Sequence, residues 1–138
     1  MEIKSYIPES KHDTELIAEL SRHEYPFYRS ILKELFEWIQ DMNWPVAKLI
    51  VPLLVKAGSD VTPVVRDILN SKDSMWIYWT LTIILNDFNY SDGKLITSDL
   101  KTELSEKLNN PTADECADTV PELIGELFAK YEVIADNE

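Results

Sequence analysis

Apolar residues recur at three- and four-residue spacings along nearly the whole chain, and this spacing is typical of amphipathic helices. The alternation of apolar and polar residues that marks a half-buried strand persists nowhere for long, and only three glycines are present to form tight hairpins. The pattern therefore predicts an all-α fold of about six to eight helices. A chain of 138 residues can bury a core without disulfides, so we expect a single domain over residues 1–138.

Capping residues and prolines divide the first half of the chain into four predicted helices. Asp13 is a good N-cap for the first, and Pro26 sets its latest end. The predicted ranges are about 13–25, 27–41, 45–57 and 59–70. The third is apolar almost all round, begins at Pro45 and stops at Gly58, so we expect it to be buried.

The second half continues with an apolar, aromatic helix over about residues 75–85 and a loop over 86–93. A further helix follows Ser98. Thr112 then forms a capping box with Glu115, and Thr119 a second one with Glu122, which fits either one kinked helix or two short ones. The inward face of this last part is predicted to hold Cys116, Val120, Leu123, Ile124, Leu127, Phe128 and Tyr131.

An offset of 32 residues aligns two apolar segments of the chain. Trp44 then falls on Trp76, and the pairs Leu49/Leu81, Val51/Ile83, Leu53/Leu85, Val64/Ile96 and Ile68/Leu100 follow. A buried helix and an amphipathic helix, repeated as a pair, are typical of a HEAT-like solenoid. The offset is shorter than the roughly forty residues of such units, so a chance alignment of two buried helices is the alternative.

Three stretches carry a resemblance to a known group of proteins. They are Trp38-Ile-Gln-Asp-Met-Asn-Trp-Pro-Val-Ala47, Trp76-Ile-Tyr-Trp79 and Asn110-Pro-Thr112. Over about residues 27–130 the chain resembles a family of small bacterial proteins of unknown function with an all-helical, HEAT-like fold. The resemblance implies a right-handed superhelix of α-helical pairs and, by analogy with related scaffolds, binding more than catalysis.

Charge is distributed unevenly. Residues 1–43 carry 9 acids and 5 bases, residues 44–97 carry 5 and 5, and residues 98–138 carry 11 and 3, which gives the net charge of -12. An acidic surface keeps a protein soluble, and it also attracts basic partners and repels nucleic acid. We therefore expect no nucleic-acid partner. The longest apolar run, residues 49–55, is too short for a membrane span, and no signal peptide is predicted.

Residues able to support catalysis or metal binding are few. His12, Glu15, Glu19 and His23 share one side of a helix, but His12 and His23 are three turns apart, about 16 Å, so one ion cannot reach both. Cys116 is the only cysteine and is expected to be buried and inert. Phosphate-binding glycine motifs and nucleophile motifs are absent from the sequence. We expect no catalytic residue, no metal and no cofactor.

Large aromatic residues cluster around the repeat, and core packing is the first explanation for them. The alternative is a groove that anchors a partner, because Trp and Tyr are enriched at interface hot spots. Trp76 and Trp79 are three residues apart and so are expected on one helix face, with Tyr78 elsewhere. The candidate partner-binding residues are Trp38, Asp41, Asn43, Trp44, Trp76 and Trp79.

The sequence thus favours a non-catalytic helical-repeat module that binds a protein partner in the bacterial cytoplasm. An immunity-type inhibitor of a basic toxin is a more specific version of this hypothesis. An uncharacterised enzyme and a structural subunit of a larger assembly are the alternatives. Oligomeric state and the identity of the partner are not encoded in any pattern of the sequence.

Overall fold

The computed structural model describes residues 2–87 and 98–130, and every regular element in these two ranges is helical. The α-helices are α1 (Thr14–Leu20), α2 (Leu32–Phe36), α3 (Pro45–Ala57), α4 (Thr62–Leu69), α5 (Ser74–Trp79), α6 (Ser98–Asn109), α7 (Ala113–Ala117) and α8 (Val120–Lys130). Short 3-10 helices lie at Ile3–Tyr6, Arg29–Ile31, Glu37–Ile39 and Gly58–Val61, and a π-helix at Thr80–Asp87. The all-α class predicted from the sequence is confirmed for the described residues.

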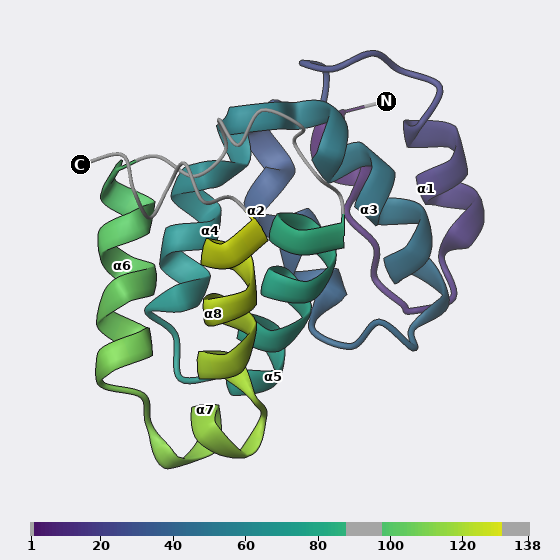
Figure 1. The fold of residues 1–138 in the computed structure, drawn as a ribbon. Helices are drawn as coiled ribbons and strands as arrows, with labels where there is room; N and C mark the ends of the chain where they lie inside the picture. Colours follow the sequence, from purple (N-terminus) through teal and green to yellow (C-terminus); the bar gives the residue numbers. More distant parts are fainter. Residues whose placement is uncertain (1, 88–97, 131–138) are drawn as a thin grey trace.

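The helices form two groups that share one core (Figure 1). Helix α1 packs on α3, while α4 packs on α6 and α6 on α8. Helix α7 lies at the lower end of the molecule in this view, beside the start of α8. The π-helix contacts both α3 and α8, and so it joins the two groups.

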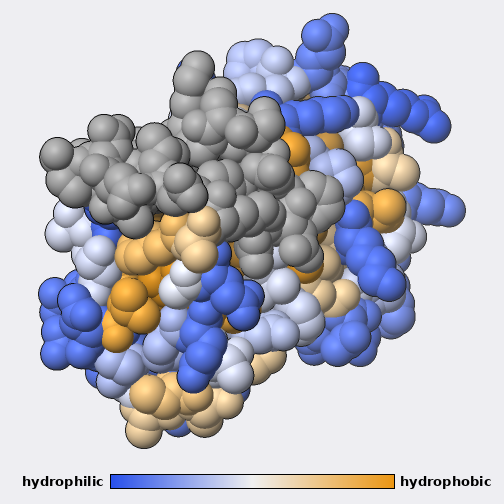
Figure 2. Space-filling model, viewed as in Figure 1, coloured by the Kyte–Doolittle hydropathy of each residue, from blue (hydrophilic) through white to orange (hydrophobic). Residues whose placement is uncertain are grey.

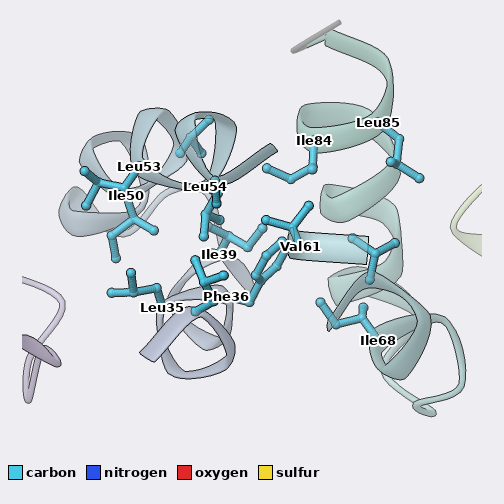
Figure 3. Close-up of a cluster of buried hydrophobic side chains, with 14 of the residues drawn as sticks. Leu35, Phe36, Ile39, Ile50, Leu53, Leu54, Val61, Ile68, Ile84 and Leu85 are labelled. Carbon is cyan, nitrogen blue, oxygen red and sulfur yellow. The ribbon is translucent and has the colours of Figure 1, made fainter. Parts of the chain in front are cut away.

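Buried side chains from four parts of the chain meet in the centre (Figure 3). Leu35, Phe36, Ile39, Ile50, Leu53, Leu54, Val61, Ile68, Ile84 and Leu85 are each at most 2% exposed. They come from α2 and the turn after it, from α3, from α4 and the turn before it, and from the π-helix. The predicted helix at 45–57 is confirmed with both of its limits, but it is buried on one side only. Its other side is exposed, at Pro45, Lys48, Leu49, Pro52 and Lys56.

Two predicted helices of the first half are shorter or more divided than expected. Helix α1 ends at Leu20, and the carboxylate of Asp13 accepts the backbone N–H groups of Glu9 and Ser10 instead of capping the helix. The segment predicted as one helix over 27–41 contains only the short α2, between two 3-10 helices. The apolar spacing survives there because 3-10 and α-turns both return a side chain to one face every three or four residues.

The residue pairs that the 32-residue offset aligns do not all have the same burial. Leu49 is 39% exposed while Leu81 is 1% exposed, whereas Leu53 and Leu85 are both buried. Helix α5 begins at Ser74, three residues ahead of the position that an offset of 32 from Pro45 gives. The change to a π-helix at Thr80 then alters the number of residues per turn. Ile96, like most of the predicted loop at 86–93, lies outside the described residues.

The C-terminal part forms two helices, α7 and α8, which decides between the two alternatives. The Thr112–Glu115 capping box is present in full, with Thr112 Oγ1 3.1 Å from Glu115 N. The prediction that Cys116 faces inward is wrong, because this thiol is exposed. The chain breaks at Thr119, so the apolar spacing of α8 does not extend back into α7. On α7 the buried side chain is that of Glu115. Tyr131 lies outside the described residues.

None of the helices in the described ranges combines the length and the apolar composition needed to cross a bilayer.

Candidate partner-binding site

Trp38 and Trp44 meet at the corner between α2 and α3. Their ring centroids are 5.5 Å apart at an angle of 62°, and both rings pack against the core. The predicted polar neighbours close this corner: Asp41 Oδ1 accepts the backbone N–H of Asn43 at 2.9 Å, and the Asp41 carbonyl accepts that of Trp44 at 3.1 Å. Four of the candidate residues thus lie together in the structure, in an arrangement that closes a turn.

Trp76 lies apart from that corner, on α5. Its indole N–H donates to the carbonyl of Phe36 at 3.0 Å, so the ring ties α5 to α2. The ring also lines a small apolar hollow of about 160 Å³ with Val64 and Ile68, and Lys33 and Asp67 complete its lining. This tryptophan is half-buried and its donor is satisfied within the fold.

Trp79 lines a different and more open hollow, which we call the α5 hollow. Its lining residues are Met75, Tyr78, Trp79, Ala117, Asp118 and Thr119, and its volume is about 370 Å³. Met75 is 41% exposed, one of the most exposed large apolar side chains in the described residues. Tyr78 and Trp79 contact each other edge to face, with centroids 4.9 Å apart and an angle of 77°. One wall is therefore aromatic, and the other is the turn between α7 and α8.

The second wall of the α5 hollow is held by polar contacts. Ser74 Oγ donates to Asp118 Oδ2 at 2.5 Å, which ties the start of α5 to the end of α7. Lys107 Nζ lies 2.6 Å from Glu115 Oε2, and this pair is largely buried, with side chains 17% and 4% exposed. Thr119 has a φ of 60°, a left-handed backbone conformation that residues other than glycine rarely adopt. Of these contacts, the hydrogen bond from Ser74 holds the carboxylate of Asp118 at the hollow.

The sequence therefore located one residue of this hollow, Trp79, and missed its companions. Tyr78 was expected on another face than Trp79, but the two line one wall together. Met75 is four residues before Trp79 and thus on the same face, a spacing that could have identified it. Asp118 carries no local sequence signal, because its contact with Ser74 joins residues that are 44 positions apart.

A second aromatic and acidic cluster lies at Tyr25, Arg29 and Asp60. Tyr25 Oη donates to Asp60 Oδ2 at 2.5 Å, and Arg29 Nη2 donates to the same oxygen at 2.9 Å. The Arg29 guanidinium also lies 5.9 Å from the centre of the Tyr25 ring. The hydrogen bonds from Tyr25 and Arg29 hold the pKa of Asp60 below its usual value, while burial and the bond to Asp60 raise the pKa of Tyr25. This cluster already contains its own cation.

The histidines of the first helix do not converge. His12, Glu15 and Glu19 line a shallow polar hollow of about 460 Å³, whereas His23 stacks on Phe27 with centroids 4.0 Å apart. In the described ranges no three His, Cys, Asp or Glu side chains are grouped so that they could share a metal ion.

The surface around α7 is less hydrophilic than the surface next to it (Figure 2). In this view weakly apolar surface gathers at the lower end of the molecule, where α7 lies in Figure 1, and hydrophilic surface adjoins it. Ala113, Cys116 and Ala117 of α7 are exposed. Of these residues, Ala117 also lines the α5 hollow.

The sequence was then compared with known proteins. Residues 6–128 match a family described as a domain of unknown function, DUF5071. The chain belongs to the DUF5071 family. The family assignment confirms the resemblance to proteins of unknown function, and no activity follows from it. No curated protein matches the DUF5071 chain.

Proposed function

We propose that this DUF5071 protein is a non-catalytic helical-repeat module whose α5 hollow binds a protein partner with a basic surface. The observation that carries the proposal is the combination of Met75, Tyr78 and Trp79 beside Asp118 in one open hollow. Most large side chains of this fold are buried, so a grouped set at an open surface is informative.

The repeat character of the proposal rests on packing between successive helices. Contacts link α1 with α3, α4 with α5 and α6, and α6 with α8. Ile68 and Leu100, one of the predicted repeat pairs, are both buried, on the helices α4 and α6 that contact each other. We infer a HEAT-like, right-handed superhelix from this packing, with α-helices of uneven length, from the short α2 and α7 to the longer α3.

The charge of the chain supports a basic partner. Residues 98–138 carry a net charge of -8 and contribute Asp118 to the α5 hollow, while the whole chain carries -12. A field of one sign speeds the approach of an oppositely charged protein and weakens as salt is added. Nucleic acid, which needs cationic side chains on the protein, is disfavoured by the same field.

Site-specific photo-crosslinking tests the proposal. A photoreactive amino acid at Met75 is expected to capture one basic protein from an extract of the producing cells, and capture should fall with rising salt. The matched control places the same group at Leu49, which is 39% exposed on α3. Equal products from both positions, or capture only of acidic proteins, would refute the proposal. Capture of a basic toxin would narrow the function to that of an immunity-type inhibitor.

A further inference from the structure

The α5 hollow resembles the Tyr25 cluster in its chemical parts. Each combines a tyrosine ring with an aspartate that accepts a hydroxyl hydrogen bond, from Tyr25 in one case and from Ser74 in the other. At the Tyr25 cluster the guanidinium of Arg29 completes the set. Arginine suits such a place because its planar cation lies over an aromatic ring and donates to a carboxylate.

The α5 hollow has no such cation of its own in the part of the chain that the structure describes. The lining of the hollow contains no lysine or arginine, and Lys107, which lies behind the α7 wall, pairs with Glu115. Asp118 Oδ2 accepts a hydrogen bond from Ser74, and this carboxylate lines the same hollow as two aromatic rings that meet at 77°. The hollow has a volume of about 370 Å³ and is open to solvent, so a long side chain can enter it.

We propose that the α5 hollow receives an arginine side chain of the partner, with its guanidinium against Tyr78 and Trp79 and paired with Asp118. This inference rests on the proposed function, because it names the group by which the basic partner is held. The positive charge would be attracted both by the ring faces and by the carboxylate, and it would displace only water.

Nuclear magnetic resonance of the indole N–H groups tests this directly, because the chain has four tryptophans and thus four such signals. The probe is N-acetyl-arginine amide at millimolar concentration, and the matched neutral probe is N-acetyl-citrulline amide. We expect a saturable shift of the Trp79 signal with the arginine probe and a much smaller one with citrulline. The Trp76 signal serves as an internal control, because its N–H donates to Phe36.

Variants make the test specific. Trp79→Phe assigns the signal, and Asp118→Asn keeps an oxygen for Ser74 while removing the charge. Asp118→Asn should weaken binding of the arginine probe by about threefold to tenfold. Equal shifts with both probes, an unmoved Trp79 signal or an unchanged Asp118→Asn affinity would each overturn the inference. If crosslinking from Met75 to a basic protein persists in that case, only the arginine contact is wrong. If arginine binds but no partner is captured, the proposed function fails instead.

Discussion

Two corners of the molecule combine aromatic rings with a carboxylate, and they differ in what completes them. At Tyr25, the carboxylate of Asp60 is joined by Arg29 from the same chain, 2.9 Å away. At Tyr78 and Trp79, the carboxylate of Asp118 is held in place by Ser74, and no lysine or arginine of residues 2–87 or 98–130 is paired with it. The carboxylate at Tyr25 thus has a cation from the same chain, whereas the carboxylate of the α5 hollow has none among the described residues. The difference suggests that the second is kept for a group from another molecule.

The largest loss of stability is expected from a change behind the α7 wall of the α5 hollow, at the Lys107–Glu115 ion pair. Glu115→Ala removes the largely buried partner of Lys107 and the acceptor of the Thr112 backbone N–H. Breaking a buried ion pair leaves an uncompensated charge, so the free energy of unfolding should fall by about 3 kcal/mol. Urea denaturation measures it, with the exposed Glu126→Ala as control. Equal, small losses for both variants would show that the wall does not depend on this pair.

Next in size is the contrast between two tryptophans. Trp38→Ala removes a ring packed against the core and should cost about 2 kcal/mol of unfolding free energy, below the cost for a fully buried ring. Trp79→Ala should cost less than about 1 kcal/mol, because its ring lines an open hollow. Thermal or urea unfolding of both variants checks the ratio. A larger loss for Trp79→Ala would make the hollow a structural feature.

A substitution in the turn between α7 and α8 is expected to stabilise the protein. Thr119 has a positive φ, which costs other residues more than glycine, so Thr119→Gly should raise the unfolding free energy by about 0.5 kcal/mol. Thr119→Ala retains the unfavourable φ and should show no gain. If both variants lose stability equally, the hydroxyl of Thr119, which donates to the Asp118 carbonyl, is the more important feature.

The smallest change in stability is expected at the Tyr25–Arg29–Asp60 cluster, and it depends on pH. Because the pKa of Asp60 is lowered in the folded protein, its charged form contributes stability above the ordinary carboxyl value of 3.8. This contribution is lost as the pH falls from that value through the lower pKa of the folded state. Asp60→Asn should therefore reduce stability slightly at pH 7, and the difference from wild type should disappear at low pH. A difference that grew on acidification would contradict this assignment.

The sequence predicted those parts of the fold that depend on local pattern. The limits of α3 follow from Pro45 and Gly58, and the start of α7 follows from the Thr112–Glu115 capping box. Cys116 was misplaced because helical periodicity was continued across Thr119, where the chain takes a left-handed turn. Met75 could have been found from its spacing to Trp79, but Asp118 depends on a contact between residues 74 and 118, and no local pattern encodes a contact over that separation.

The central claim is that the rings of Tyr78 and Trp79 contribute to binding, whereas Trp76 on the same helix packs against the core. The most direct measurement is the affinity of the protein captured through Met75 for the wild type and for Trp79→Ala, measured by titration calorimetry at fixed salt. Trp38→Phe, which keeps a ring beside Trp44 between α2 and α3, is the control. We predict that Trp79→Ala weakens binding by about tenfold or more while the control binds like the wild type. An affinity that is the same for all three proteins would contradict the account.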